Sequence, residues 1–316
     1  MTKITEWANA TGEFNRQISS FRKWIKKGTE FEPESNRYHL IVSKACPWAC
    51  RTLAVRAIKK LEDVISMSVV HYHMEEKGWR FATHENEADG VDVDSKRPYL
   101  RDYYFASEPD YSGRFTVPVL YDKKTDKIVN NESSEIIRIL NSEFNAFSGA
   151  PDINLYPDAL KTQIDQLNEW VYDKINNGVY KTGFATKQDV YEKHCRSVFE
   201  GLDKVEAILS KNQFLCGDYV TEADIRLFVT IVRFDPVYVG HFKCNLKTIE
   251  FGYPKILNWT RRLYQYEGMS DTVNMFHIKH HYYMSQTQIN PNKVVALSNG
   301  PDLSVKVDPV TSKHFQ

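Results

Sequence analysis

The spacing of apolar residues in the first half of the chain changes between the period of a strand and that of a helix. Runs rich in β-branched and aromatic residues predict four short strands, at 38–43, 64–70, 116–121 and 127–130. Apolar residues at helical spacing predict three helices, beginning at Pro47, near 98–105 and around 136–144. The resulting order of strand, helix, strand, helix, strand, strand and helix is that of a thioredoxin-like α/β domain.

The second half of the chain shows helical periodicity only. One apolar stripe runs through Ile164, Leu167 and Val171, and similar stripes continue to about residue 283. The four residues from Thr221 to Asp224 predict a capping box, in which the Asp224 carboxylate accepts a hydrogen bond from the N–H of Thr221 and so opens a helix. We therefore expect an all-helical second domain.

The pattern places these two domains between two irregular ends. We expect an N-terminal extension at 1–36, a thioredoxin-like domain at 37–147, an all-α domain at 155–285 and a tail at 286–316. The extension is polar with spaced aromatic residues, and we expect it to pack on the body of the protein with a short helix near 15–27. A loose tail is the alternative. A polar insertion at about 86–96 interrupts the first domain.

Composition and charge narrow the class of protein. The 316 residues suffice for two domains with sizeable cores. Lys plus Arg and Asp plus Glu balance at 41 each without long blocks of like charge, which argues against a nucleic-acid partner. No stretch of about 18 apolar residues is present to span a membrane, and five scattered cysteines indicate a reducing compartment. We therefore expect a cytoplasmic protein without a membrane partner.

Cys46 has the clearest chemistry in the sequence. It stands where a predicted strand ends and a predicted helix begins, with Pro47 suited to the first helical turn. The N–H groups and dipole of a helix start favour a thiolate, so we expect a pKa below the usual value, and Lys44 and Arg51 can add to the positive field. A buried, inert cysteine is the alternative. Cys50 follows at a spacing of four rather than three, so we expect a single-cysteine site that an external thiol must resolve.

Two further motifs follow along the chain. Val117-Pro118 precedes a strand, and a cis proline there would offer the backbone of Val117 to a peptide-like ligand; an ordinary trans proline is the alternative. Glu132-Ser133 opens a helix that Ser133 can cap, and the N–H groups of that helix can bind a carboxylate. Glutathione carries such a carboxylate beside an ammonium that Glu132 can bind. With Cys46, these motifs predict a thiol site for glutathione.

These motifs resemble those of the glutathione transferase superfamily. Within it the chain is most similar to the Xi class, the glutathionyl-hydroquinone reductases, which are related to the Omega class. The resemblance covers roughly Tyr38 to Pro291 and departs from the family's pattern at Tyr121 and Cys50. The stretches that carry it are 45–49, 112–120, 130–133, 176–185, 221–227, 233–238 and 277–283. The last three lie in the helical domain and are much more specific than the Cys-Pro-Trp motif alone.

The resemblance implies a role for nine residues. Cys46 would be the nucleophile and Tyr180 the proton donor and acceptor, while Tyr238 and Tyr282 would lie near the sulfur and the substrate oxygens. The residues that would hold glutathione are Trp79, Arg114, Val117, Glu132 and Ser133. The chain has 18 tyrosines, so core packing is the alternative for each of them. The resemblance also implies a homodimer.

No metal is expected. His277, His280 and His281 have no cysteine or carboxylate set nearby at the spacing of metal ligands. A phenol, by contrast, can hydrogen-bond a thiolate or give a proton without any metal. The resemblance thus implies glutathione as a co-substrate and Tyr180 as the acid group.

The reaction implied by the resemblance is the glutathione-dependent reduction of an S-glutathionyl-hydroquinone to the hydroquinone. It would pass through a mixed disulfide of Cys46 with glutathione and release oxidised glutathione. Three alternatives remain open at this point. They are an Omega-like thiol transferase or dehydroascorbate reductase using the same cysteine, a non-catalytic glutathione- or ligand-binding protein, and a structural scaffold.

Overall fold

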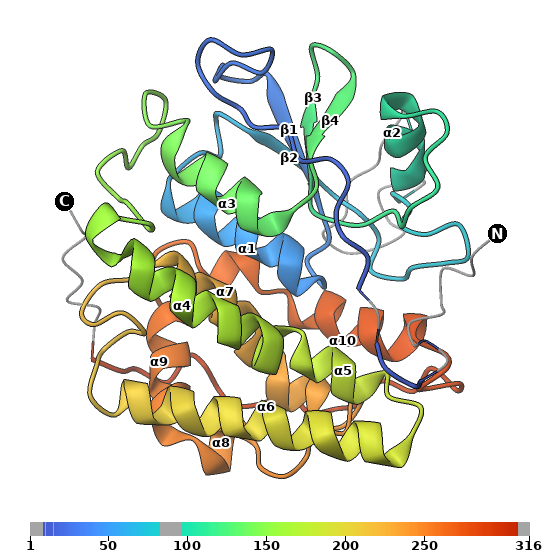
Figure 1. Cartoon of the computed structure of the whole chain (residues 1–316), viewed down its shortest axis with the longest axis vertical. Helices are drawn as coiled ribbons and strands as arrows, with labels where there is room; N and C mark the ends of the chain where they lie inside the picture. Colours follow the sequence, from blue (N-terminus) through green and yellow to red (C-terminus); the bar gives the residue numbers. More distant parts are fainter. Residues whose placement is uncertain (1–8, 10, 15, 83–96, 309–316) are drawn as a thin grey trace. The chain divides into compact units, whose positions relative to one another are not determined.

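The computed structural model describes residues 9, 11–14, 16–82 and 97–308, which form two compact units (Figure 1). The first unit contains Gln17–Ile153 and Thr272–His281. The second contains Asn154–Asp271 together with the described residues up to Arg16 and those after His281. The predicted insertion at 86–96 lies outside the described residues.

A four-stranded mixed sheet forms the centre of the first unit. Its strands are β1 (Tyr38–Val42), β2 (Ser66–Val69), β3 (Val119–Asp122) and β4 (Lys127–Asn130), in the order β2-β1-β3-β4. β1 is parallel to β2 and antiparallel to β3, and β3 is antiparallel to β4. The helices of this unit's thioredoxin-like part are α1 (Pro47–Ile58), α2 (Leu100–Ser107) and α3 (Ser133–Ser142). The predicted order of strands and helices is confirmed.

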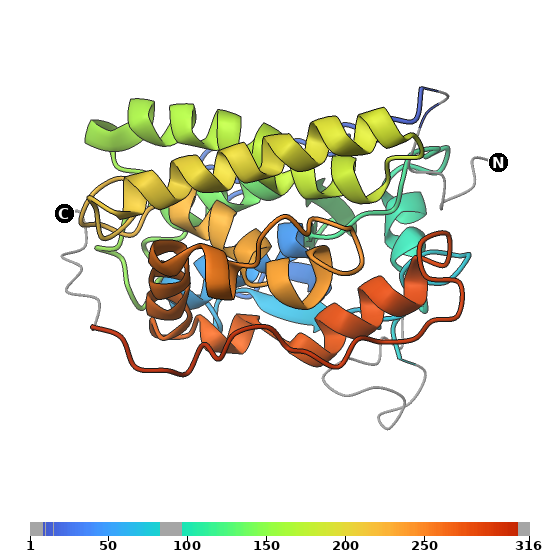
Figure 2. The ribbon, with the colours of Figure 1, turned by 90° about the horizontal axis from the view of Figure 1, so that it is seen from below.

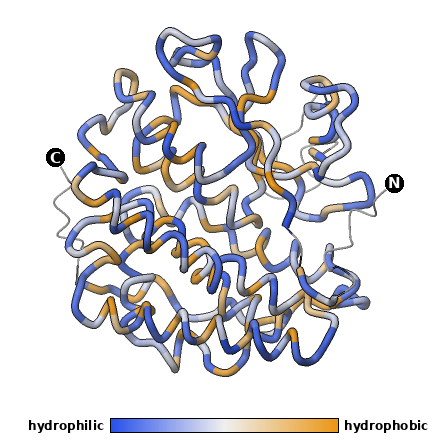
Figure 3. Tube along the Cα trace, viewed as in Figure 1, coloured by the Kyte–Doolittle hydropathy of each residue, from blue (hydrophilic) through white to orange (hydrophobic). Residues whose placement is uncertain are grey.

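Strand β1 lies in the interior of the sheet, and four of its five residues are buried. Leu40, Ile41 and Val42 have no exposed surface, and the tube of Figure 3 is apolar through much of this region. Helix α1 packs against α3, while α2 contacts β4. Each fully buried aliphatic side chain contributes about 1.5–3 kcal/mol, so β1 is firmly held. It ends only four residues before Cys46 and therefore fixes where that residue lies.

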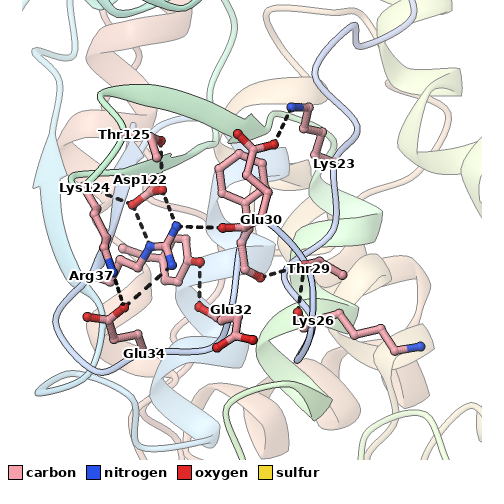
Figure 4. A network of polar contacts seen from close by, with 12 residues as sticks. Lys23, Lys26, Thr29, Glu30, Glu32, Glu34, Arg37, Asp122, Lys124 and Thr125 are labelled. Carbon is pink, nitrogen blue, oxygen red and sulfur yellow. Dashed lines mark hydrogen bonds and ion pairs between the residues drawn. The ribbon is translucent and has the colours of Figure 1, made fainter.

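A buried ion pair fastens the chain just before β1 to the end of β3 (Figure 4). The Arg37 guanidinium donates to both carboxylate oxygens of Asp122, Nε to Oδ1 at 3.0 Å and Nη2 to Oδ2 at 2.8 Å. Thr125 and the N–H of Lys124 donate to the same carboxylate, and Arg37 also donates to the carbonyl of Glu30. Burial raises the pKa of Asp122, but the hydrogen bonds from these donors lower it by a larger amount. The pKa of Asp122 therefore lies below its ordinary value.

The helix predicted near 15–27 is wrong, because the described residues 16–27 form no helix. This stretch instead pairs with β4, where Arg22 and Asn130 form an antiparallel bridge. The N–H of Lys23 donates to the carbonyl of Val129 at 3.1 Å. The edge strand β4 thus supplies hydrogen bonds to a backbone that would otherwise have to make them within a helix.

Helices build the second unit, as predicted (Figures 1 and 2). Its α-helices are α4 (Lys161–Val171), α5 (Gly178–Gly183), α6 (Gln188–Leu209), α7 (Glu222–Ile231), α8 (Ile249–Gly252) and α9 (Pro254–Tyr264). Its shorter turns are the 3-10 turn η1 (Asp158–Leu160) and the π-helical turns η2 (Tyr172–Asn176) and η3 (Phe234–Tyr238). The 3-10 turn η4 (Ser270–Thr272) and helix α10 (Met275–Ser285) each contain residues of both units.

Helix α7 begins with the predicted capping interaction. The carboxylate of Asp224 accepts hydrogen bonds from the N–H of Thr221 at 2.9 Å and from its hydroxyl at 3.0 Å. It also accepts the N–H of Leu215 and the indole N–H of Trp259, each at 3.0 Å. This buried carboxylate therefore fixes the start of α7, and with it the direction in which the chain runs towards η3 and Tyr238.

Two kinds of feature are absent from the described residues. None of the helices there is long and apolar enough to cross a membrane. Nor do the His, Cys, Asp and Glu side chains in this part of the chain form a group of three or more that could hold a metal ion. Within α10, Nδ1 of His280 lies 2.8 Å from the carbonyl of Phe276, and Nδ1 of His281 lies 2.9 Å from that of Tyr72.

Candidate functional site

Cys46 lies at the start of α1, as the sequence predicts. It is the N-cap residue, with extended backbone angles (φ −78°, ψ 121°), and Pro47 occupies the first turn. The carbonyl of Cys46 accepts the N–H of Cys50 at 3.0 Å, so the first helical hydrogen bond begins at Cys46 itself. The thiol therefore stands where the helix N–H groups and dipole favour a negative charge.

Cys46 is also the only one of the five cysteines that is not buried. Burial raises the pKa of Cys216 to about 12 and that of Cys244 well above its ordinary value. Cys50 is buried one turn into α1, and its thiol lies 3.3 Å from the carbonyl of Lys44. None of the five cysteines, all of which lie within the described residues, is joined in a disulfide. The structure thus separates one accessible thiol from four enclosed ones.

Val117, one of the predicted glutathione-binding residues, lies close to the thiol. Its carbonyl oxygen lies 3.7 Å from the Cys46 sulfur. The Val117-Pro118 peptide bond is cis, as the sequence motif predicts. The thiol and a backbone carbonyl suited to a peptide-like ligand are therefore neighbours within the first unit.

Arg114 lies three residues earlier in a loop that is held from both sides. Its N–H donates to the Gln17 side-chain oxygen at 3.0 Å, and its carbonyl accepts the hydroxyl of Tyr111 at 2.9 Å. A side chain at Gly113 would come too close to the side chains of Tyr111 and Gln17, so one of them would have to shift. The backbone of Arg114 is fixed, and its half-buried side chain projects from a defined position.

The start of α3 differs in one detail from the sequence prediction. Glu132, not Ser133, is the N-cap residue, and its carboxylate accepts the N–H of Ser134 at 3.0 Å. The prediction that Ser133 caps the helix is wrong, because a carboxylate one residue earlier takes that place. Ser133 is instead the first helical residue, and its hydroxyl lies 3.4 Å from the guanidinium of Arg51.

The charge of Glu132 is stabilised where it lies. Burial raises the pKa of its carboxyl group, but the hydrogen bonds from Ser134 and Ser19, together with the charge of Arg51, lower the pKa by a larger amount. The pKa therefore lies below the ordinary value for glutamate. Arg51 belongs to α1 and is itself buried, with its guanidinium carbon 4.5 Å from the centre of the Trp48 ring. Sequence reasoning assigned Arg51 to the thiol and missed its place beside Ser133.

Trp79, a further predicted glutathione-binding residue, is buried in the first unit. Its ring stacks on the imidazole of His281 with centroids 4.7 Å apart and an angle of 27° between the planes. A carbonyl oxygen can only accept, so Nδ1 of His281 carries the proton that it shares with the carbonyl of Tyr72. The orientation of His281 is therefore fixed, and it supports one face of the Trp79 ring.

The three predicted tyrosines come together in the second unit. The hydroxyl of Tyr282 lies 2.6 Å from that of Tyr180 and 3.0 Å from that of Tyr238. Tyr180 is half-buried, whereas Tyr238 and Tyr282 are buried. The three phenols thus form a hydrogen-bonded chain with its most accessible end at Tyr180.

The buried members of this chain are held in the neutral form. Burial raises the pKa of Tyr238 and of Tyr282 well above the ordinary value, and the nearby phenol of Tyr180 raises both further. The charge of Arg233, which is itself fully buried, offsets part of this effect. These two phenols therefore keep their protons and can donate hydrogen bonds.

Two π-helical turns orient the tyrosines. In η3 the N–H of Tyr238 donates to the carbonyl of Arg233, five residues back, at 3.3 Å. Pro236 lies inside this turn and has no N–H to donate, which explains the wider turn. The turn η2 ends with the N–H of Asn177 bonded to the carbonyl of Tyr172 at 2.8 Å, shortly before Tyr180. Sequence reasoning missed both turns, although Pro236 was a visible signal for one.

Phe242 is a central residue of the tyrosine cluster that sequence reasoning missed. Its ring is nearly parallel to that of Tyr238, with an angle of 9° and centroids 5.4 Å apart. It meets the rings of Tyr180 and Tyr282 edge-on at 5.4 and 5.6 Å. Only glycine fits at position 183, because a side chain there would overlap the Phe242 ring.

Comparison with known families follows the same division of the chain. Residues 45–143 match the family description "Glutathione S-transferase, N-terminal domain", and residues 188–262 match "Glutathione S-transferase, C-terminal domain". The chain belongs to the glutathione transferase superfamily. The first match runs from just before Cys46 through α3, and the second covers α6 to most of α9, so together they include the predicted site residues apart from Tyr180 and Tyr282.

Individual relatives narrow the class. The chain is 52% identical to "Glutathione S-transferase omega-like 2" of Schizosaccharomyces pombe, over 96% of this chain and 98% of that protein. It is 48% identical to "Glutathionyl-hydroquinone reductase YqjG" of Escherichia coli, over 92% of this chain and 90% of that protein. YqjG has been solved with glutathione bound, and that structure matches with a TM-score of 0.86 at 46% identity, covering 92% of this chain and 96% of that one.

The solved structures agree with this assignment. The glutathione transferase Xi of Phanerochaete chrysosporium matches with a TM-score of 0.90 and 49% identity over 96% of each chain. Within the superfamily the chain is therefore an enzyme of the Xi class, a glutathione transferase-family oxidoreductase. The thioredoxin-like and all-helical fold expected from the sequence is confirmed.

Proposed function

We propose that the protein is a glutathionyl-hydroquinone reductase. In the proposed reaction it removes glutathione from an S-glutathionyl-hydroquinone and releases the hydroquinone and oxidised glutathione. The observation that carries the proposal is the half-buried Cys46 thiol at the start of α1, in a chain 48% identical to a relative described as such a reductase. A thiol can form the disulfide intermediate that this reaction needs, which a serine or tyrosine hydroxyl cannot.

The first half of the reaction forms a mixed disulfide. The Cys46 thiolate attacks the sulfur of the glutathionyl group, and the bond between that sulfur and the aromatic carbon breaks. The electron pair of that bond goes to the aromatic carbon, which takes a proton from Tyr180. The aromatic ring is reduced by two electrons, and the two sulfur atoms are oxidised to the disulfide. Tyr180 then regains its proton from water.

The second half of the reaction restores the enzyme. The thiolate of a free glutathione attacks the glutathione sulfur of the mixed disulfide, which releases oxidised glutathione and the Cys46 thiolate. No other thiol of the chain is required. The burial of Cys50 supports this part of the proposal, because an enclosed thiol is poorly placed to resolve the disulfide.

The first unit supplies the groups that would hold the glutathionyl moiety. We assign the γ-glutamyl ammonium to the Glu132 carboxylate, and its carboxylate to Ser133 and the N–H groups at the start of α3. The backbone of Val117, 3.7 Å from the thiol, would pair with the cysteinyl part. We assign Trp79 and Arg114 to the remaining parts of the tripeptide. The low pKa of Glu132 supports its role, because an ammonium group is best bound by an ionised partner.

We assign the three tyrosines of the second unit to the aromatic part of the substrate. Tyr180 would give the proton, and Tyr282 and Tyr238 would hold its hydroxyl in place through their hydrogen bonds of 2.6 and 3.0 Å. The raised pKa of Tyr282 and Tyr238 supports this role, since phenols that remain neutral can donate.

One experiment tests the proposal directly. The protein is mixed with a glutathionyl-hydroquinone, quenched with acid and weighed intact, and the released hydroquinone is measured in the same sample. We expect one added glutathione, located on Cys46, and one hydroquinone released per enzyme. The Cys50→Ser variant should behave like the wild type, whereas Cys46→Ser should give neither product. An unmodified wild-type protein that releases no hydroquinone would contradict the proposal.

A second candidate is an Omega-like thiol transferase or dehydroascorbate reductase. The 52% identity to a relative described as omega-like favours it, and it would use the same thiol. The hydroquinone reaction needs an acid that protonates carbon, whereas a thiol transfer breaks only bonds to sulfur and needs no such acid. Comparing kcat/KM for a glutathionyl-hydroquinone, a mixed disulfide and dehydroascorbate in wild type and Tyr180→Phe separates them. Loss confined to the hydroquinone supports the first candidate.

A further inference from the structure

Residues 17–23, which come before the thioredoxin-like elements, run along the edge of the sheet in the first unit. The N–H of Lys23 donates to the carbonyl of Val129, and the carbonyl of Phe21 accepts the N–H of Asn131 at 3.0 Å. The pairing therefore continues past the end of β4 to the residue just before Glu132. Two side chains of this segment reach residues that the proposed function assigns to glutathione.

The first of these side chains is Ser19. Its hydroxyl donates to Oε2 of Glu132 at 3.0 Å. The other oxygen, Oε1, accepts the N–H and the hydroxyl of Ser134 at 3.0 and 2.9 Å. Both oxygens of the carboxylate are thus held, one by the helix that it caps and the other by the N-terminal segment. Without Ser19 the carboxylate would be held on one side only.

The second side chain is Gln17. Its carbonyl oxygen accepts the backbone N–H of Arg114 at 3.0 Å. The opposite side of the same residue is held by the Tyr111 hydroxyl, and a side chain at Gly113 would press on both Gln17 and Tyr111. Gln17 is exposed, so its role lies in this contact rather than in core packing.

We propose that the N-terminal segment contributes two side chains to the glutathione site, Ser19 as the positioning residue of Glu132 and Gln17 as that of Arg114. This inference rests on the proposed function for the assignment of Glu132 and Arg114. Neither Ser19 nor Gln17 reacts. Ser19 keeps the Glu132 carboxylate aimed at the γ-glutamyl ammonium, and Gln17 fixes the loop from which the Arg114 side chain projects. The segment therefore acts on the binding of both the glutathionyl substrate and free glutathione.

The test compares Ser19→Ala with Ile18→Ala, its neighbour in the same segment. Ile18 is 82% exposed and serves as the matched control. Loss of one hydrogen bond to a charged group corresponds to roughly a tenfold change in affinity. We expect Ser19→Ala to raise the KM for glutathione about tenfold while kcat falls by less than about twofold. Ser19→Thr, which keeps the hydroxyl, should restore the wild-type KM, and Gln17→Ala should raise it by a smaller factor.

Direct binding separates this inference from the proposed function. Calorimetric titration with glutathione needs no turnover, and thermal unfolding of each variant reports whether the fold is intact. Weaker glutathione binding by folded Ser19→Ala supports the inference even if the wild type fails to release hydroquinone, a result that would contradict the proposed function alone. A dissociation constant for Ser19→Ala within about threefold of the Ile18→Ala value would overturn the inference.

Discussion

Removal of the middle hydroxyl of the tyrosine chain is the most informative perturbation of the proposed acid group. Tyr282 lies between Tyr180 and Tyr238, with hydroxyl separations of 2.6 and 3.0 Å. Its replacement by phenylalanine removes both hydrogen bonds at once and keeps the ring that packs edge-on against Phe242. The change is therefore confined to one oxygen atom.

The size of the effect follows from what Tyr180 must do. When Tyr180 gives up its proton it becomes a phenolate, and the hydrogen bond from Tyr282 then acts on a charged acceptor. Such a bond contributes about 1.5–3 kcal/mol, which corresponds to roughly a 10- to 160-fold change in kcat. Tyr238→Phe removes only the bond farther from Tyr180, so its effect should be smaller. Tyr180→Phe removes the donor itself and should cost on the order of 10²–10⁴-fold.

Tyr283 provides the matched control. It is the next residue of α10, it is also buried, and its hydroxyl lies 3.3 Å from the carbonyl of Pro236 rather than in the chain of phenols. The assay is hydroquinone release under saturating substrate, with alkylation of Cys46 by iodoacetamide as a measure of the thiol alone. Tyr282→Phe should slow release and leave alkylation unchanged. Equal kcat values for Tyr282→Phe and Tyr283→Phe would refute the reasoning.

Three further predictions concern single residues. Cys50→Ser should keep at least about half of the wild-type activity, and a tenfold loss in steady-state turnover would make Cys50 a resolving thiol. Asp122→Asn should lower the free energy of unfolding by about 3 kcal/mol because the buried Arg37 charge loses its partner; denaturant unfolding measures this. The pKa of Asp122 is lowered in the fold, so its contribution to stability is complete above the unfolded value of about 3.9 and disappears as the pH falls through the folded value; the variant should show a flatter acid limb. Gly183→Ala should displace Phe242, lower the free energy of unfolding by about 1–3 kcal/mol and slow hydroquinone release. Thermal unfolding and the release assay measure the two effects, and a variant equal to the wild type in both would contradict the crowding at this position.

The fold was predictable where local pattern and tertiary contacts agree. The apolar periods that place β1 and α1 are the same residues that become buried, so the sequence indicates both elements correctly. The failure at 15–27 has the opposite cause. The backbone of Lys23 obtains its hydrogen-bond partner from Val129, more than a hundred residues away, and no local pattern reports the presence of an open sheet edge.

The site was predictable in its residue types and less so in its details. Cys46 at a helix start follows from a strand-to-helix change next to Pro47, which is local information. The cap at Glu132 was misassigned because serine is the more usual cap, whereas the carboxylate here also receives the hydroxyl of Ser19 from a distant segment. Phe242 carries no motif, and only the three-dimensional packing of the rings identifies it.

The two groups of site residues have opposite protonation requirements, and each is met by its own surroundings. A thiol must lose its proton to attack sulfur, and the helix start at Cys46 favours the anion. In the proposed reaction Tyr180 must hold its proton until the aromatic carbon takes it, and its neighbours Tyr282 and Tyr238, whose anions burial disfavours, stay neutral as hydrogen-bond donors. A thiol in the buried surroundings of Cys244 would not form the nucleophilic thiolate, because the pKa of Cys244 is raised well above its ordinary value. In the proposed reaction, nucleophile and acid can therefore coexist at one pH, because the helix start favours the thiolate of Cys46 while neutral buried phenols donate hydrogen bonds beside Tyr180.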